Sequence, residues 1–279
     1  MQTTLNSGTV AKTVKVKATI DSLSISSEAI SIAIHGGPPD AAHFSVVPQY
    51  LNFAGWKTYG LQNTITAFIG DQYGNPVPEG TSVYFSTTGG IIEGSGNTNS
   101  LGQVSVTLVS ASPLPVSTAL DPSTEYTTDV SGYCDFTSPK NGDGQAIIFA
   151  QTVDRLGDPI WTDTRTIFSG DTGIFDVSPS SFAVPNGGSQ SFSFRVHDLN
   201  GNPLTAGTTV NVTASAGDLV GNVNVTLPDT QSAGWTGFSF LLMDGDAAET
   251  DPAETCIVTI TVTSAQNGNA SVIIMGSVD

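Results

Sequence analysis

Carboxylates are concentrated in the segment MDGDAAETDPAETC at 243–256, the clearest candidate for chemistry in the chain. The acidic residues of this segment are Asp244, Asp246, Glu249, Asp251 and Glu254. Ca²⁺ takes about six to eight oxygen ligands from flexible loops, and a D-x-D spacing can place two carboxylates on one side. The glycine and terminal glutamate of an EF-hand do not fall at the required positions. Two interpretations therefore stay open: a calcium site, or a solvated acidic loop that discourages edge-to-edge strand pairing.

Aromatic side chains gather in two short stretches of the sequence. The residues are Tyr50, Phe53, Trp56 and Tyr59 in one stretch and Trp235, Phe238 and Phe240 in the other. Exposed planar rings stack on sugars, which makes Trp56, Tyr59 and Trp235 candidates for polysaccharide binding. Such rings also fill a sandwich core or brace a domain joint. The exposure of Trp56, Trp161 and Trp235 is the observation that separates these alternatives.

No set of residues points to a reaction. His35, His43 and His197 are scattered, and no HExxH, G-x-S-x-G, Walker or dinucleotide-binding pattern occurs. The two cysteines, Cys134 and Cys256, fall in different predicted domains, so they are either apolar thiols or a disulfide between domains or chains. We expect a protein that is not an enzyme and that has no cofactor, unless the acidic segment binds Ca²⁺.

The charge balance limits the partners of the protein. Its formal net charge is −17, with 8 basic and 25 acidic residues. Nucleic acids and anionic membrane surfaces need cationic contacts, so nucleic acids are nearly excluded as partners, anionic membrane surfaces are disfavoured, and cations are favoured. No apolar run is long enough for a membrane helix, and the start MQTTLNSGTV lacks the basic and apolar regions of a signal peptide. We expect no membrane insertion.

Apolar residues alternate with polar ones almost throughout the chain. The segment 189–197, SQSFSFRVH, is the clearest case, because its phenylalanines and valine occupy every second position. A period of two is typical of strands with one buried and one wet face, and no segment keeps a helical period. Strands separated by Gly, Asn and Pro at about 8–15 residues predict an all-β protein of tandem immunoglobulin-like β-sandwiches.

Two Pro-containing segments divide the chain. GGPPDAAHFSV at 36–46 predicts a linker, because paired prolines end a strand and stiffen the chain. SGDTGIFDVSPSSF at 169–182 has the same character. The expected domains are 1–37, a linker at 38–43, a sandwich at 44–170 with an insertion near 111–144, and a sandwich at 171–279. Each piece ends in a strand pair, at 13–20 and 29–35, at 145–153 and 162–168, and at 256–263 and 270–276.

A six-residue turn phrase occurs three times: DQYGNP at 71–76, DRLGDP at 154–159 and DLNGNP at 198–203. The Asp side chain can accept the amide two residues on, Gly supplies a positive φ, and Pro sets φ as the chain leaves the turn. The first and third copies precede matching segments, PVPEGTSVYFSTTGG and PLTAGTTVNVTASAG. These two mark an internal repeat, whereas DRLGDP lies inside a terminal hairpin.

The segment 64–108, TITAFIGDQYGNPVPEGTSVYFSTTGGIIEGSGNTNSLGQVSVTL, resembles the bacterial immunoglobulin-like domains of the invasin and intimin type. The matching features are the D-x-x-G-N-P-V-P turn, the V-x-F strand, the Gly-Gly bend and the strand LGQVSVTL. The resemblance covers roughly 36–110, weakens over 111–144, and becomes a general immunoglobulin-like pattern in the last piece. It implies an extracellular or cell-surface bacterial protein without catalytic residues, in which tandem sandwiches form a rod.

The function expected from these features is a structural or adhesive rod module, with Pro-containing joints that hold its domains in line. Its expected partners are flanking domains or other copies, a polysaccharide, or a host or cell-surface protein. The alternative is a carbohydrate-binding region of a secreted enzyme. The first piece holds two strands and three of the 8 basic residues, Lys12, Lys15 and Lys17. An isolated hairpin is marginal in water, so this piece is either the end of a truncated domain or completed by a neighbour, as in a head-to-tail fibre.

Overall fold

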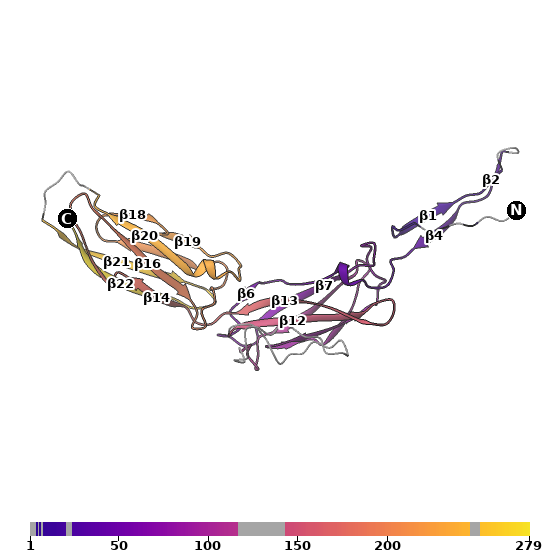
Figure 1. Ribbon diagram of the computed structural model, residues 1–279, viewed down its shortest axis with the longest axis horizontal. Helices are drawn as coiled ribbons and strands as arrows, with labels where there is room; N and C mark the ends of the chain where they lie inside the picture. The colour runs from indigo at the N-terminus through magenta and orange to yellow at the C-terminus, as the bar shows by residue number, and fades with distance from the viewer. Residues whose placement is uncertain (1–3, 5, 7, 21–23, 117–142, 246–251) are drawn as a thin grey trace.

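The computed structural model consists of a two-stranded ribbon followed by two β-sandwiches (Figure 1). It describes residues 4, 6, 8–20, 24–116, 143–245 and 252–279. Beyond short 3-10 turns such as η2 (Ala41–His43) and η3 (Ala233–Thr236), the regular structure of these residues is β-strand. Within the described part, no helix is long and apolar enough to cross a membrane. The all-β prediction is confirmed.

The N-terminal ribbon is a pair of antiparallel strands that extends away from the first sandwich (Figure 1). β1 (Lys12–Val16) pairs with β4 (Ile30–Ile34), and a shorter pair, β2 (Thr19–Ile20) and β3 (Ile25–Ser26), lies beyond it. No other described strand pairs with β1 or β4. The ribbon therefore has two open edges.

The first sandwich packs a five-stranded sheet, ordered β10-β8-β12-β13-β6, on a four-stranded sheet, ordered β5-β7-β11-β9. The strands are β5 (Phe44–Pro48), β6 (Asn52–Phe53), β7 (Gln62–Ile69), β8 (Ser82–Thr87), β9 (Ile91–Ile92), β10 (Ser95–Asn97), β11 (Gln103–Val109), β12 (Gln145–Val153) and β13 (Pro159–Phe168). The alternating sequence places every second side chain between the sheets, as in β7, where Ile65 and Ala67 are fully buried. The predicted insertion at 111–144 lies mostly outside the described residues.

The second sandwich repeats this plan with a five-stranded sheet, β15-β22-β21-β17-β19, and a four-stranded sheet, β14-β16-β20-β18. The strands are β14 (Gly173–Ser178), β15 (Ser181–Val184), β16 (Ser189–His197), β17 (Thr209–Ala214), β18 (Asp218–Gly221), β19 (Asn224–Thr226), β20 (Gly237–Met243), β21 (Glu254–Thr263) and β22 (Ala270–Val278). Each strand from β5 to β13 has its counterpart in β14 to β22, in the same order and sheet position. The internal repeat thus extends over both sandwiches.

Each sandwich has its own apolar core. In the second core Phe192 stacks on Phe240, with ring centroids 4.7 Å apart, and meets Phe182 edge-on at 5.2 Å. Cys256 is buried in this core as a free thiol, whereas Cys134 lies outside the described residues. In the first core Phe53 meets Phe168 edge-on at 4.5 Å. Since each core is closed by its own terminal strand pair, each sandwich is a complete packing unit.

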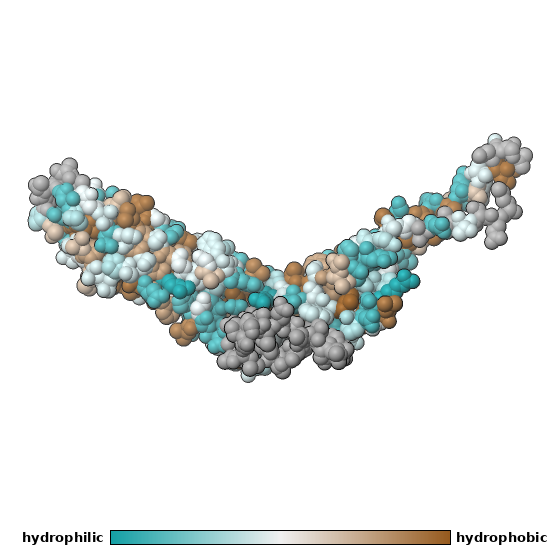
Figure 2. Space-filling view, in the orientation of Figure 1, coloured by the Kyte–Doolittle hydropathy of each residue, from teal (hydrophilic) through white to brown (hydrophobic). Residues whose placement is uncertain are grey.

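The connection between the two sandwiches is shorter than the sequence predicts. Segment 169–182 was expected to be a linker, but β14 and β15 occupy 173–178 and 181–184. Pro179 separates these two strands, which belong to different sheets of one sandwich. The expectation of Pro-containing joints that hold the domains in line is also wrong at this junction. Only residues 169–172 connect the sandwiches, none of them is proline, and the molecule bends there (Figure 2).

Candidate functional site

The predicted calcium loop is only partly described. Asp244 Oδ2 accepts a 2.7 Å hydrogen bond from the amide of Gly187, and Glu254 begins β21. Asp246, Glu249 and Asp251 lie outside the described residues. Among the residues that the structure does describe, no group of three or more His, Cys, Asp or Glu side chains could hold a metal. The calcium site stays a prediction.

Titration with Ca²⁺ tests the calcium prediction directly. If the acidic segment 243–256 binds the ion, calorimetry will show heat of binding, and the melting temperature will rise because only the folded state binds. Asp246→Asn combined with Asp251→Asn should abolish both signals. The absence of heat and of a melting shift in the wild-type protein would rule the site out and leave a solvated acidic loop.

The aromatic candidates come from separate elements. Trp56 follows β6, is half-buried and packs against the first core, while Tyr59, three residues on, is 60% exposed. Trp235 lies in η3 of the second sandwich and is 39% exposed. Trp161 is half-buried beside Phe149. The surroundings of Trp56 and Trp161 fit bracing of the fold. Sugar binding by Trp56, Tyr59 and Trp235 stays a prediction.

The three copies of the turn phrase have one backbone conformation. In each copy the Oδ1 atom of the Asp accepts the amides two and four residues on, at 2.7–2.9 Å. The same Asp exchanges two backbone hydrogen bonds with the residues three and four positions on. The glycines, Gly74, Gly157 and Gly201, have φ of 77°, 85° and 81°, a region that other residues seldom adopt. The predicted turn chemistry is confirmed for all three.

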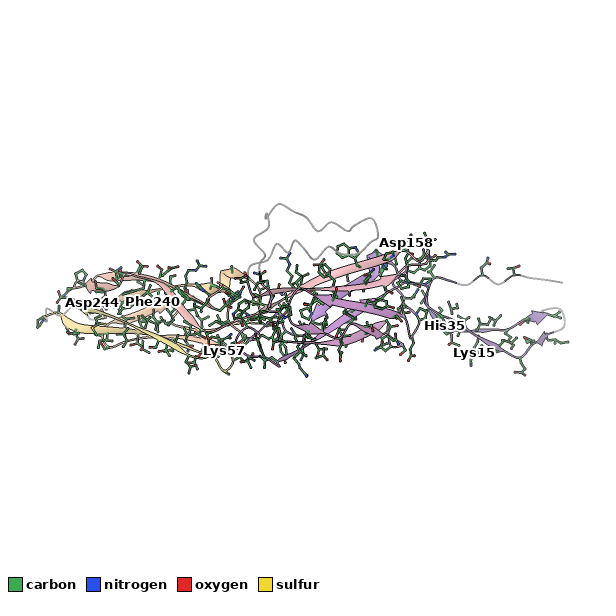
Figure 3. The ribbon with its side chains drawn as sticks, turned by 90° about the horizontal axis from the view of Figure 1, so that it is seen from below. Lys15, His35, Lys57, Asp158, Phe240 and Asp244 are labelled. Atoms are coloured by element: carbon green, nitrogen blue, oxygen red, sulfur yellow. The ribbon has the colours of Figure 1, made fainter. Side chains whose placement is uncertain are left out.

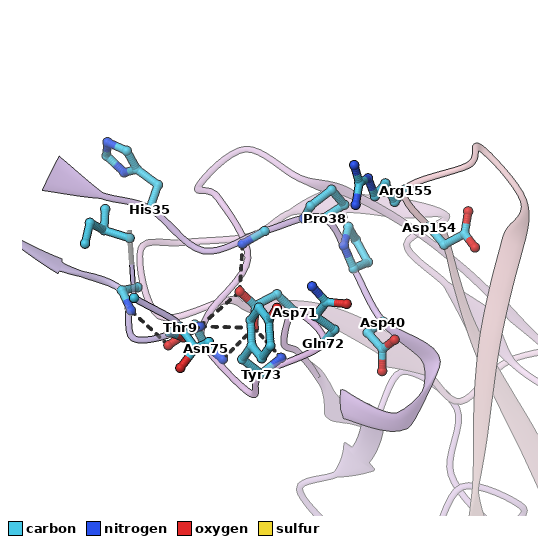
Figure 4. A pocket seen from close by; sticks show the side chains of 15 residues that line it. Thr9, His35, Pro38, Asp40, Asp71, Gln72, Tyr73, Asn75, Asp154 and Arg155 are labelled. Carbon is cyan, nitrogen blue, oxygen red and sulfur yellow. Dashed lines mark hydrogen bonds between the residues drawn. The ribbon is translucent and has the colours of Figure 1, made fainter. Parts of the chain in front are cut away.

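In the first copy, the turn also holds the ribbon (Figure 4). The second oxygen of Asp71, Oδ2, accepts a 2.8 Å hydrogen bond from the amide of Gly37, just after β4. The side-chain amide of Asn75 donates to the carbonyl of Thr9, just before β1, at 2.7 Å, and to Asp71 Oδ2 at 3.0 Å. We call this arrangement, an Asp and an Asn that hold both ends of the preceding strand pair, the clasp.

The third copy of the phrase forms the same clasp at the junction between the sandwiches. Asp198 Oδ2 accepts a 2.8 Å hydrogen bond from the amide of Gly170, just after β13. The side-chain amide of Asn202 donates to the carbonyl of Asp143, just before β12, at 2.8 Å. Both contacts reach only backbone atoms of the preceding unit. The clasp therefore depends on the position of a terminal strand pair and not on its side chains.

The middle copy, DRLGDP, is a turn without a clasp. It joins β12 to β13, and the position that Asn75 and Asn202 hold in the other copies is occupied by Asp158, which is exposed. A carboxylate cannot donate to a carbonyl, so this copy lacks the second arm of the clasp. Asp158 lies at the end of the first sandwich that faces the ribbon, whereas Lys57 marks the opposite end (Figure 3).

Asn267, in the turn between β21 and β22, is the second centre of the junction between the sandwiches. It is 1% exposed, and its amide nitrogen donates to Ser169 Oγ at 2.9 Å and to the carbonyl of Gly170 at 2.7 Å. Its Oδ1 accepts from the amide and hydroxyl of Thr205 at 2.9 and 2.7 Å. One buried side chain thus links the connecting segment to the second sandwich. Buried polar groups that are fully hydrogen-bonded define a single arrangement.

Further contacts join the loop around β6 to the second sandwich. Both oxygens of Asp229 accept backbone amides, from Leu51 at 2.8 Å and Asn52 at 2.9 Å. Lys57 Nζ donates to the carbonyl of Asn267 at 2.8 Å and forms a 2.8 Å ion pair with Asp171. Because Asp171 is well exposed, the ion pair contributes little. The junction is stabilised mainly by the buried hydrogen bonds of Asp198 and Asn267.

The electrostatics of the first clasp favour an ionised Asp71. Burial by itself raises the pKa of this carboxyl group, but hydrogen bonds from Gly37, from the Asn75 side chain and from the Tyr73 and Asn75 amides outweigh it. Together they lower the pKa of Asp71 from 3.8 to about 2. The carboxylate therefore remains charged, and able to accept all of these hydrogen bonds, down to strongly acidic pH.

Acid should weaken the first clasp. Because the folded pKa of Asp71 lies below its unfolded value of 3.8, its contribution to stability is complete above about pH 4 and is lost as the pH falls through about 2. The expected loss is about 2 kcal/mol. It is measured as an Asp71 carboxyl titration by NMR together with faster exchange of the Gly37 amide. In the variant Asp71→Asn, the Gly37 amide should exchange fast even at neutral pH. A titration midpoint of the Asp71 carboxyl group near pH 4 in the wild-type protein would contradict the prediction.

Comparison with known proteins gives similarity in structure only. No protein-family model matches the chain, and no curated protein matches it in sequence. Among solved structures, the chain is similar to FdeC, an Escherichia coli adhesin, at 15% identity and a TM-score of 0.38, covering 98% of this chain and 75% of that one. It is also similar to a C-terminal fragment of intimin in complex with the intimin-binding domain of Tir, at 14% identity and a TM-score of 0.34, covering 82% and 62%.

A third similar structure is the Yersinia pseudotuberculosis adhesin InvE, at 12% identity and a TM-score of 0.31, covering 86% of this chain and 60% of that one. The chain thus spans less than two thirds of the intimin fragment and of InvE. These structures are of the type that the segment 64–108 resembles in sequence. At such low identities and TM-scores, the fold assignment rests on the strand topology, and the function rests on the site.

Proposed function

We propose that this chain is a non-catalytic structural or adhesive rod module of a bacterial cell-surface or secreted protein. The observation that carries the proposal is the junction between the sandwiches, where Asp198, Asn202 and Asn267 hold the two ends of the strand pair β12–β13. The hydrogen bonds of Asp198 and Asn267 are buried, and that of Asn202 is part-buried. A junction with this many fixed contacts keeps one angle between domains, whereas flexible linkers allow many. A fixed angle suits a spacer that presents a partner at a defined distance.

The mechanical part of the proposal follows from the strand arrangement. Each sandwich holds its terminal strands between neighbours on both sides, as β12 lies between β8 and β13. Extension of the rod must therefore break several backbone hydrogen bonds together. The partners that we propose are flanking domains of the same protein and a host or cell-surface protein or polysaccharide at the tip of the rod.

Small-angle X-ray scattering and residual dipolar couplings test the rod. We expect one orientation of 174–279 relative to 44–168 to fit both data sets, in low and in high salt. A broad distribution of orientations would contradict the proposal. Surface location is tested on intact cells of the organism that encodes the chain: antibodies against the sandwiches should label them, and labelling that needs permeabilised cells would contradict it.

Assembly into a fibre is a separate prediction. Lys12, Lys15 and Lys17 lie in or beside β1, and the chain as a whole carries a charge of −17, so the lysine side chains of one copy could form ion pairs with an acidic sandwich of the next. Such ion pairs do not require strand pairing at the edges of β1 and β4. Light scattering at low and high salt tests this. Association that high salt disperses is the expected result, and a monomer under both conditions would contradict fibre formation by these residues.

A further inference from the structure

One face of the N-terminal ribbon is apolar and uncovered. In the register of β1 and β4, Val14 lies opposite Ile32 and Val16 opposite Ile30, so these side chains share one face. Ile30 is 68% exposed and Ile32 is 38% exposed. Thr13, Lys15, Ser31 and Ala33 occupy the other face, and Lys12, opposite Ile34, lies at one end of the apolar face. This alternation is that of a strand pair that closes a sandwich core, yet neither apolar core of the described residues includes these side chains.

The ribbon also has two open edges that its counterparts do not have. In the first sandwich, β12 pairs antiparallel with β8, and β13 pairs parallel with β6. In the second sandwich, β21 pairs antiparallel with β17, and β22 pairs parallel with β15. By this comparison, and among the described strands, β1 lacks a second antiparallel neighbour and β4 lacks a parallel one.

The clasp identifies the ribbon as the counterpart of these terminal strand pairs. Asp71 and Asn75 hold Gly37 and Thr9, at the two ends of the ribbon, as Asp198 and Asn202 hold Gly170 and Asp143 at the two ends of the pair β12–β13. The chain also approaches the turn closely, because a Cβ atom on Gly36 would collide with the carbonyl oxygen of Pro76. The ribbon is thus placed where the end of a preceding sandwich belongs.

A pocket lies at the junction between the ribbon and the first sandwich. The equivalent place at the junction between the two sandwiches is filled by protein. It has a volume of about 290 Å³ and is lined by His35, Pro38, Tyr73, Asp154 and Arg155, among others (Figure 4). Asp154 and Arg155 belong to the turn between β12 and β13. In the second sandwich the matching turn, which holds Asn267, contacts Lys57 and Ser169 of the preceding sandwich. The pocket therefore corresponds to the place of the loop that follows β6.

We propose that the ribbon and this pocket together bind the body of an immunoglobulin-like sandwich that lacks its last strand pair. The inference rests on the proposed function as a tandem rod. That body contributes a strand parallel to β4, a strand antiparallel to β1, and an apolar sheet that covers Val14, Val16, Ile30 and Ile32. Its loop fills the pocket. A second copy does not meet this description, because both of its sandwiches contain their own terminal pairs.

The chain itself provides the probe for a test. Residues 44–116, the body of the first sandwich up to the strand β11, are placed before Met1 of the full chain through a Gly/Ser linker. We expect the added body to use the ribbon as its terminal pair, so that the amides of β1 and β4 exchange about 100-fold more slowly than in the unextended chain. Hydrogen-exchange mass spectrometry of the 12–34 peptides measures this.

The matched control is the extended chain with Ile30→Lys and Ile32→Lys, which should lose the added protection while both original sandwiches stay protected. Unchanged exchange of the ribbon in the extended chain would overturn the proposal. So would a dimer of the unextended chain in sedimentation whose ribbon becomes protected, because the partner would then be a second copy. Neither outcome affects the fixed angle at the junction between the two sandwiches. The rod proposal is therefore tested independently, by scattering and residual dipolar couplings.

Discussion

Asp198→Ala is expected to destabilise the second sandwich by about 3 kcal/mol, because hydrogen bonds to a charged group are strong and their loss leaves buried donors unpaired. Asp198 is 0% exposed, and its carboxylate accepts the amides of Gly170, Asn200 and Asn202. The substitution removes the turn and one arm of the clasp together. Urea unfolding, followed by hydrogen exchange of peptides from 171–279, measures the loss.

Asp154→Ala is the matched control, since Asp154 forms the same turn at the tip of the hairpin β12–β13. Its expected cost is about 1 kcal/mol, the value of an ordinary turn contact. Equal costs for the two substitutions would mean that the clasp adds nothing to the turn. A larger cost at Asp198, with faster exchange of the Gly170 amide, is the result that supports the clasp.

Asn267→Ala is expected to loosen the junction between the sandwiches and to cost about 2–3 kcal/mol, because it leaves buried partners on both sides unsatisfied. The partners are Ser169 and Gly170 in the preceding segment and Thr205 in the second sandwich. Residual dipolar couplings should then require several orientations where the wild type needs one. The radius of gyration from X-ray scattering should change with them.

The control for this substitution is Asn269→Ala in the same turn. Asn269 Oδ1 accepts a 3.1 Å hydrogen bond from the amide of Ser264, which is a contact within the second sandwich. The control should cost about 1 kcal/mol and leave the orientation unchanged. A single orientation in Asn267→Ala would show that Asp229 and the clasp suffice to fix the angle.

Much of the fold could be predicted from the sequence, because strands and turns depend on residues close in the chain. The expected strands at 145–153 and 162–168 match β12 and β13, and those at 256–263 and 270–276 match β21 and β22 within a few residues. Segment 169–182 was misassigned, because glycine and proline mark the ends of strands as well as the joints between domains. There Pro179 marks the gap between two strands of one sandwich.

The candidate site could be predicted only in part. The phrase D-x-x-G-N-P was recognised as a turn, but the role of its asparagine was not. The turn itself does not require asparagine at this position. DRLGDP, with Asp158 in that place, forms the same turn. The difference between Asn and Asp at this position is therefore the one feature of the sequence that could have indicated the clasp. Asn267 and Asp229 had no signal, because single polar residues in turns are common.

The alternation, the three turns and the repeat follow from residues close in the chain, since the Asp side chain bonds amides only two and four residues away. The partners of the remaining polar atoms depend on how the sheets and sandwiches pack. Asp71 meets Gly37 across 34 positions and Asn75 meets Thr9 across 66, while Asp198 meets Gly170 across 28. Those partners come together only after two sheets have packed and the next sandwich has docked on the last strand pair. No local pattern specifies that arrangement.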